Sequence, residues 1–176
     1  MREIQGCIDN ILNRRSIRKF KSDPISTEHL ELMLSCMEAA PSAGNLQPWF
    51  FYVVKNQIIK NQLCALSFNQ QSVQEAPVVF VVCANPAISV TQYGQLGETL
   101  FCLQDTASAV QNLLLAAHSM GYGAVWIGVV KAQEIAQLLE LPSELNPIAL
   151  IPVGFPNEPP GIKERKGWQT LTKFIE

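Results

Sequence analysis

The stretch APVVFVVCA, residues 76–84, is apolar throughout and shows no alternation between apolar and polar residues. A run of this kind is typical of a strand inside a sheet, with both faces covered by other elements. Pro77 agrees with this interpretation because proline is tolerated at the first position of a strand. The stretch therefore predicts an inner strand, around which the rest of the fold is arranged.

Other segments supply further strands and the helices. WFFYVV (49–54) is aromatic and β-branched and lies between polar turn residues, which predicts a strand. GAVWIGVV (123–130) and NPIALIPVG (146–154) predict two more. Apolar residues at helical spacing predict helices over 4–13, 27 to about 40, 56–66, 99–120 and 131–141, the second of them capped by Ser26 or Thr27.

The order of these elements indicates the fold class. Helices and strands alternate in the second half, but the chain opens with two helices and closes with an unassigned tail at 161–176. This order predicts one α+β domain over residues 1–176, with mixed α/β layers instead of a plain doubly wound sheet. The tail carries too much apolar surface to remain in water, so we expect it to dock, with a partner subunit as one available surface. Its apolar residues are Trp168, Leu171, Phe174 and Ile175.

Composition restricts the class of partner. The net charge of -2 argues against binding to nucleic acid or to an anionic membrane surface, because both require a broad basic face. Hydrophobic residues make up 48% of the chain and charged residues 16%, which favours a homodimer that covers apolar surface. No apolar run approaches the roughly 20 residues of a membrane span, and the start MREIQGCIDN lacks the apolar core of a signal peptide. We therefore expect a cytoplasmic protein.

Metal and covalent chemistry find little support. The five cysteines are widely spaced without a CxxC pair, and His29 and His118 lie far apart, so we expect buried free thiols and no metal site. GYGAVWIG (121–128) lacks the third glycine of a dinucleotide fingerprint and follows a helix instead of preceding one. The acids in apolar surroundings, Glu75, Glu98 and Asp105, do not form a pair on one face, which predicts solvated or capping roles for them.

The stretch RRSIRKF, residues 14–20, holds three arginines and a lysine in a chain that is otherwise short of charge. Guanidinium groups match a phosphate with planar, bidentate geometry, so the stretch is a candidate phosphate site. The alternative is that these cations lie at a helix C-terminus and complement its dipole. A second cationic cluster, IKERK (162–166), is either part of the same site or a solvated surface.

The loop APSAGNLQPW, residues 40–49, combines small residues, two amide side chains and a proline between a helix and a strand. Such a loop can approach a flat ring closely, and its amides can donate and accept hydrogen bonds. The alternative is an ordinary polar turn.

Taken together and in order, these motifs resemble the nitroreductase family of flavin enzymes over nearly the whole chain. The stretches that carry the resemblance are RRSIRKF, APSAGNLQPW, QEAPVVFVV, DTASAVQNLLLAAHSMGYG, AVWIG, IPVGFP and IKERK. The resemblance implies a central, mostly antiparallel sheet flanked by helices, in an intertwined homodimer with two FMN molecules at the interface. It also implies that the C-terminal segments reach across to the partner.

The resemblance also assigns candidate cofactor-binding residues. It places the FMN phosphate and flavin side chain against Arg14, Arg15, Ser16 and Arg18, and the phosphate also against Lys163 and Arg165. It brings a loop from the partner subunit to the flavin, with Pro41, Ser42 and Asn45, and with Gln47 close behind. Backbone groups of Trp126, Ile127 and Gly128 would lie along the ring, and Asn69 is a looser match to a residue at the ring edge.

The implied activity is transfer of electrons from NAD(P)H through FMN to a nitroaromatic, quinone or related acceptor by a ping-pong mechanism, with FMN carrying the chemistry and no catalytic side chain. One departure is a flavin-covering segment shortened to NPAISVTQYGQLGE, which leaves the substrate open. The alternatives are a specialised flavin enzyme of the same family, a non-catalytic FMN-binding protein, and a nucleic-acid binder that the acidic balance disfavours.

Overall fold

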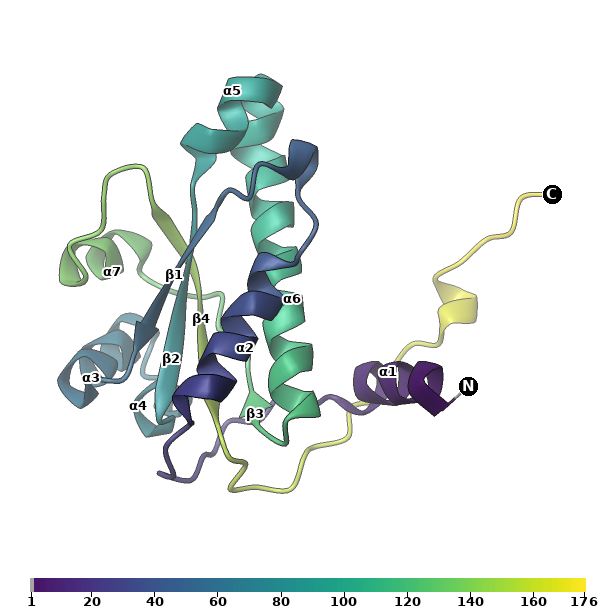
Figure 1. Cartoon of the computed structure of the whole chain (residues 1–176), viewed down its shortest axis with the longest axis horizontal. Coiled ribbons are helices and arrows are strands. Elements are labelled where there is room, and N and C mark those ends of the chain that lie inside the picture. The colour runs from purple at the N-terminus through teal and green to yellow at the C-terminus, as the bar shows by residue number, and fades with distance from the viewer. Residues whose placement is uncertain (1) are drawn as a thin grey trace.

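The computed structural model describes residues 2–176 and contains a four-stranded antiparallel sheet with helices on both faces (Figure 1). The strands lie in the order β1-β2-β4-β3, with bounds β1 Trp49–Val54, β2 Val78–Ala84, β3 Gly123–Ala124 and β4 Asn146–Gly154. The helices are α1 Arg2–Asn13, α2 Thr27–Glu38, α3 Gln57–Leu66, α4 Gln71–Glu75, α5 Pro86–Leu96, α6 Cys102–Ser119 and α7 Ala132–Leu138. The predicted α+β class with a central antiparallel sheet is confirmed.

Strand β2 forms the centre of the molecule, and all of its residues are buried. Val78, Phe80 and Val82 pack in one apolar cluster with residues of α2 and α6. Val79 and Val81 belong to a second cluster with residues of α3, α4 and α7 on the opposite face. Because successive side chains of a strand point to opposite faces, a fully apolar strand serves both layers. The inner strand predicted from residues 76–84 is confirmed.

Helix α2 begins where the capping pattern predicts. The Ser26 hydroxyl accepts a hydrogen bond from the His29 backbone N–H at 3.2 Å, which satisfies one of the donors left free in the first turn. The helix ends at Glu38, slightly before the predicted stop near Pro41. Of the two candidate caps, the structure selects Ser26.

The segment before α6 is more structured than the sequence pattern indicates. Residues 86–96 form α5, for which we predicted no element, and residues 97–101 form one turn of π-helix. Helix α6 accordingly begins at Cys102 instead of Thr99. Gly97 allows this arrangement because a Cβ there would overlap the Ser89 carbonyl group. The segment predicted as an abbreviated flavin cover thus consists of helix α5 and a π-helical turn that leads into α6.

The predicted strand over 123–130 is wrong as a continuous element, since β3 has only the residues Gly123 and Ala124. The chain nevertheless keeps the register of β4, because Ile127 and Leu150 exchange backbone hydrogen bonds of 3.0 and 2.9 Å. Pro152 lies in β4 between these pairs and has no N–H to donate, so the ladder is interrupted there.

Helix α1 and the tail lie to one side of the body and bring both ends of the chain to the same side (Figure 1). In the tail, a single 3-10 turn forms at Trp168–Thr170, and Trp168 and Ile175 are 61% and 92% exposed. No helix among residues 2–176 is both long and apolar enough to cross a bilayer. The thiols of Cys64, Cys83 and Cys102 are buried as predicted, whereas Cys7 is exposed and Cys36 is half-buried.

Candidate functional site

Two segments that are far apart in the sequence meet beside α1. The Lys21 N–H donates to the Phe155 carbonyl and the Asn157 N–H donates to the Lys19 carbonyl, each at 2.9 Å. The Glu158 carboxylate accepts from the Arg18 N–H at 2.6 Å and from the Lys19 N–H at 3.3 Å. This short antiparallel pairing brings the cationic cluster at 14–18 next to the cluster at 162–166.

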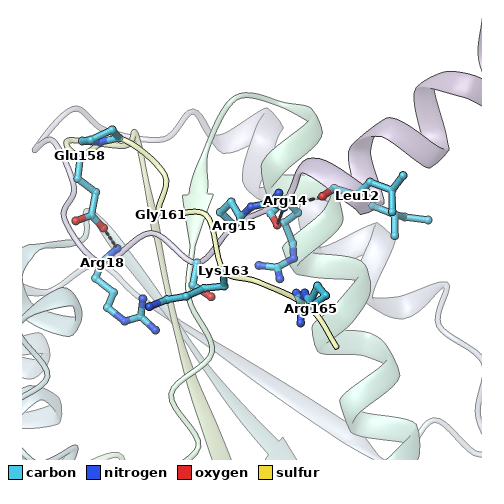
Figure 2. Close-up of a pocket in the computed structure, with 11 residues that line it drawn as sticks. Leu12, Arg14, Arg15, Arg18, Glu158, Gly161, Lys163 and Arg165 are labelled. Carbon is cyan, nitrogen blue, oxygen red and sulfur yellow. Dashed lines mark hydrogen bonds between the residues drawn. The ribbon is translucent and has the colours of Figure 1, made fainter. Parts of the chain in front are cut away.

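A cavity of about 600 Å³ lies between the two clusters. We call it the cationic pocket; its charged lining consists of five cations and one acid, Arg14, Arg15, Arg18, Lys163, Arg165 and Glu158. Figure 2 shows Arg14 beside Arg165, and Arg18 beside Lys163. Ser16 also lines the pocket. The structure therefore brings together all of the residues that the resemblance places near a phosphate.

The charges in the cationic pocket are unbalanced. Burial, together with the nearby positive charges of Arg165 and Arg15, lowers the pKa of Arg14. Burial and the charges of Arg14 and Arg15 likewise lower the pKa of His118, a residue of α6. A group of like charges that disfavour one another is stabilised when an anion binds among them.

The two adjacent arginines have different surroundings. The Arg15 guanidinium donates from Nη1 to the carbonyls of Leu12 and Arg14, at 2.6 and 2.9 Å. These carbonyls lie at the C-terminal end of α1, where helix carbonyls lack partners within the helix. Arg15 therefore fills the helix-terminus role that we considered as an alternative, whereas Arg14 lies toward Arg165 in the pocket (Figure 2).

The cationic pocket is tied to the segment that carries Trp126, Ile127 and Gly128. Ser16 forms a parallel bridge with Ala124, and the Ile17 N–H donates to the Ala124 carbonyl at 3.1 Å. Trp126, two residues further on, is 39% exposed. Backbone contacts therefore join the pocket to the chain that leads into this segment.

Asn69 follows helix α3, whose end is attached to the chain after Gly128. The Lys131 N–H donates to the Leu66 carbonyl at 2.9 Å, which holds the end of α3 next to the chain that follows Gly128. Asn69 is exposed and has a positive φ of 59°. Positive φ values are uncommon for residues other than glycine and are enriched at functional sites.

The remaining predicted site residues, Pro41, Ser42, Asn45 and Gln47, lie elsewhere. They belong to the Pro41–Pro48 loop, which follows α2 and packs near α5 and the start of α6. A contact between this loop and α6 involves Asp105, whereas α1 is attached to α6 at Leu115, which accepts a hydrogen bond from Asn10. Ten residues of α-helix span about 15 Å. One chain alone therefore does not bring the loop to the cationic pocket.

The Pro41–Pro48 loop has an unusual backbone. Gly44, Asn45 and Gln47 have φ values of 58°, 56° and 51°. The Ser42 hydroxyl accepts from the Gln47 N–H at 3.0 Å, which closes the loop from within. The ordinary polar turn that we considered as an alternative does not require left-handed conformations at so many positions.

Of the two roles predicted for Asp105, solvated or capping, the solvated one is wrong. Asp105 is 8% exposed, and its Oδ1 accepts a hydrogen bond from the Ala43 N–H at 3.1 Å. Burial raises the pKa of Asp105, and the hydrogen bond from Ala43 partly opposes this. The sequence signal was an acidic residue within an apolar helix pattern, but only the folded structure shows which loop it contacts. Glu158, which joins the two cationic segments, was not identified from the sequence either.

The fold and the site together define an α+β protein with a cationic pocket suited to an anion such as a phosphate monoester. Comparison with known proteins narrows this class. The model of the nitroreductase family matches residues 11–74 and 65–155. The chain therefore belongs to the nitroreductase family.

Individual relatives agree with this assignment. The chain is 35% identical over 160 residues to an Archaeoglobus fulgidus protein provisionally named NADH dehydrogenase/NAD(P)H nitroreductase, covering 88% of each chain. It is 33% identical over 172 residues to the NADPH-flavin oxidoreductase of Vibrio harveyi, covering 92% of this chain and 70% of the relative. The solved structure of the Vibrio harveyi NADPH:FMN oxidoreductase complexed with NAD+ is similar with a TM-score of 0.88 and 30% identity, covering 97% of this chain and 77% of that one.

Proposed function

We propose that the protein is an FMN-dependent oxidoreductase that takes electrons from NAD(P)H and passes them to a nitroaromatic, quinone or related acceptor. The observation that carries this proposal is the cationic pocket and its direct connection, through Ser16 and Ala124, to the Trp126–Gly128 segment. The names of relatives in the nitroreductase family support the same activity.

The residues of the cationic pocket fit the FMN phosphate. A phosphate monoester carries about -1.5 to -2 charges at neutral pH. Five cations against a single carboxylate leave more than enough positive charge to balance it. Pockets of about 300–1,000 Å³ are typical for ligands of this size, and the cavity of about 600 Å³ falls within this range.

We assign the direct phosphate contacts to Arg14, Arg18, Lys163 and Arg165. Arg15 already donates to two carbonyls of the chain, so it contributes charge more than hydrogen bonds. The Glu158 carboxylate, which accepts two backbone hydrogen bonds, holds the segment in place instead of competing for the cations.

The flavin ring would lie along the Trp126–Gly128 segment, with Asn69 at its edge. FMN, when bound, supplies the hydride and electron chemistry. The chain contributes binding and orientation: Ile127 is fixed by two backbone hydrogen bonds to Leu150, which holds the neighbouring backbone groups in place. We propose that NAD(P)H and the acceptor occupy the same site in turn, which predicts ping-pong kinetics.

We propose a homodimer in which the Pro41–Pro48 loop of one chain completes the flavin site of the other. The distance between loop and pocket within one chain supports this arrangement. Exposed apolar side chains provide the surface to be covered, on α1, near the start of α6 and in the tail. They include Ile11, Leu12, Leu100, Leu103, Leu171 and Phe174. We expect the tail from residue 161 to dock on the partner subunit.

Anaerobic reduction of the purified, FMN-loaded protein tests the proposed function. We expect NADH or NADPH to bleach the visible flavin band, and subsequent addition of a quinone or nitroaromatic compound to restore it. Comparison of NADH with NADPH gives the electron donor. For a ping-pong mechanism, we expect parallel lines in double-reciprocal plots of the initial rate at several acceptor concentrations. A bound flavin that neither nucleotide reduces would favour the non-catalytic alternative.

Free flavin is a second candidate acceptor, because the Vibrio harveyi relative is named as a flavin oxidoreductase. The same assay with excess FMN or riboflavin distinguishes free flavin from a quinone or nitroaromatic compound as the acceptor. Faster turnover with free flavin than with quinone or nitroaromatic would identify a flavin reductase.

A further inference from the structure

The Pro41–Pro48 loop requires support from outside itself. Asn45 and Gln47 are left-handed although neither is glycine, and such residues adopt this conformation at a cost in free energy. The internal hydrogen bond between Ser42 and Gln47 spans the centre of the loop but fixes neither of its ends to the body. The surrounding structure must therefore hold the two ends.

Two adjacent residues of α6 hold these ends. The Asp105 Oδ1 accepts from the Ala43 N–H at 3.1 Å, at the beginning of the loop. The Thr106 hydroxyl lies 3.3 Å from the Pro48 carbonyl at its end and also donates to the Cys102 carbonyl at 2.6 Å. The Asn85 N–H supports the Pro48 carbonyl with a second hydrogen bond of 2.9 Å. The first anchor therefore depends on Asp105, whereas the second is shared.

We propose that Asp105 is a positioning residue that fixes the Pro41–Pro48 loop in its binding conformation, with Thr106 as a weaker second anchor. This inference deepens and rests on the proposed function, in which the loop contacts the flavin of the partner chain. Asp105 of one chain therefore sets the flavin affinity of the site that its loop completes, without touching the flavin itself.

The burial of Asp105 supports this role. Its Oδ2 is buried and has no hydrogen-bond partner among residues 2–176. A buried carboxylate with half of its acceptors unused is unfavourable, so an apolar residue would suit the core better if packing were its only role. What the carboxylate provides is a charge-assisted acceptor for the Ala43 N–H, which is stronger than a neutral one. The raised pKa of this carboxyl group reflects the same burial.

A suitable control exists on the same helix. The Asn112 Nδ2 donates to the Cys36 carbonyl at 2.9 Å and joins α6 to α2, about two turns along α6 from Asp105 and without a hydrogen bond to the Pro41–Pro48 loop. Removing it deletes one side chain–backbone hydrogen bond of α6, as removing the Asp105 carboxylate does. If the loop changed only because the whole protein had become less stable, the change would therefore occur both in Asp105→Ala and in Asn112→Ala.

The experiment compares Asp105→Ala, Asp105→Asn and Asn112→Ala in the full-length chain, with and without FMN. Backbone amide exchange of Ala43, Asn45 and Gln47 is followed by NMR, the FMN dissociation constant by flavin fluorescence, and stability by thermal unfolding. We expect Asp105→Ala to speed exchange of the loop amides and weaken FMN binding by about 10-fold each, as for loss of one buried hydrogen bond. Asp105→Asn keeps an acceptor oxygen, so it should retain most of the slow amide exchange and most of the FMN affinity of the wild type. Asn112→Ala should lower the unfolding temperature and leave the loop amide exchange and the FMN dissociation constant unchanged.

The outcomes separate the inference from the proposed function. Unchanged loop exchange in Asp105→Ala, or an equal effect in Asn112→Ala, would overturn the positioning role. Faster loop exchange with unchanged FMN affinity would overturn the link to the flavin. If the wild-type chain binds no FMN, the proposed function fails, while amide exchange still tests the anchoring of the loop by Asp105. If Asp105→Ala does not fold, Asp105→Leu, which fills the same buried space without an acceptor, decides: faster loop exchange supports the anchor and unchanged exchange contradicts it.

Discussion

The cationic pocket and the Pro41–Pro48 loop are two parts of one proposed site, but they are built in different ways. The pocket consists of charged side chains from segments about 150 residues apart, and burial together with its like charges lowers the pKa of Arg14. The loop is a single short segment with a strained backbone, anchored to α6 through a buried carboxylate. We expect an anion to stabilise the pocket, whereas the loop is already held by hydrogen bonds of the chain itself.

This difference indicates how each part should respond to change. The attraction between the cationic pocket and a phosphate is weakened by salt. A preorganised loop lowers the entropy cost of binding and is insensitive to salt. Substitutions of the cations assigned to the phosphate should therefore lower affinity without lowering stability, and substitutions in the loop should lower both.

The largest effect is expected from Arg14→Ala. Removal of one guanidinium should weaken FMN binding by about 10- to 100-fold, the range for loss of a hydrogen bond to a charged group. The thermal unfolding temperature of the FMN-free protein should stay the same or rise, because repulsion from Arg165 is relieved. Fluorescence titration at low and high salt measures the affinity, and Lys55→Ala, at an exposed position outside the pocket lining, is the control. Equal affinities for Arg14→Ala and the control would remove Arg14 from the phosphate site.

A somewhat smaller effect is expected from Gly44→Ala in the loop. Gly44 has a φ of 58°, and an added Cβ would lie 2.8 Å from the side chains of Gln92 and Tyr93. We expect the free energy of unfolding to fall by about 1–2 kcal/mol because both the conformation and the space are unfavourable to alanine. Urea unfolding measures the change. Gly6→Ala is the matched control, since nothing lies within 4 Å of a Cβ there and alanine favours a helix. A stability loss as large in the control would contradict the comparison.

Arg15→Ala should weaken FMN binding less than Arg14→Ala does, by about 2- to 5-fold, as for a nearby charge without a direct hydrogen bond. Its main effect should be on α1, because Arg15 supports the carbonyls of Leu12 and Arg14. Titration with FMN, together with amide exchange along α1, measures both effects. Equal losses of affinity in the two variants would show that the helix-terminus role does not separate these arginines.

The smallest effect is a pH dependence of the free energy of unfolding that arises from Asp105. Burial raises the pKa of Asp105 above its value in the unfolded chain. The group therefore favours the folded state below its unfolded pKa, and this contribution is lost as the pH rises through the folded-state pKa. Wild-type stability should fall relative to Asp105→Asn as the pH rises from the ordinary aspartate pKa of about 3.9 through the raised pKa of the folded state. Urea unfolding of both proteins over this range measures the difference. The same pH dependence of the unfolding free energy in both proteins would contradict a raised pKa of Asp105 in the folded chain.

Local patterns were sufficient to predict much of the fold. Residues 76–84 predicted the central strand because an unbroken apolar run reports burial on both faces, and Ser26 marked the start of α2. The break in the strand after Ala124 depends on Pro152 in another strand, so no local pattern could show it. Helix α5 was missed because its residues carry no clear apolar periodicity.

Local patterns also predicted part of the candidate site. The cationic segments were visible as clusters of charge, and the structure brings them to one pocket. The separate surroundings of Arg14 and Arg15 depend on how α1 ends, which the sequence leaves open. The burial of Asp105 depends on contact with a loop about 60 residues away in the sequence, beyond the reach of any local pattern.

The most direct test of the central claim compares the affinities of FMN and riboflavin, which differ only in the phosphate. We expect wild-type protein to bind FMN at least about 100-fold more tightly than riboflavin, as for several charge-assisted hydrogen bonds, and this preference to shrink in Arg14→Ala and Arg165→Ala. Equal affinity for the two flavins, or a preference that both variants retain, would contradict the assignment of the cationic pocket to the phosphate.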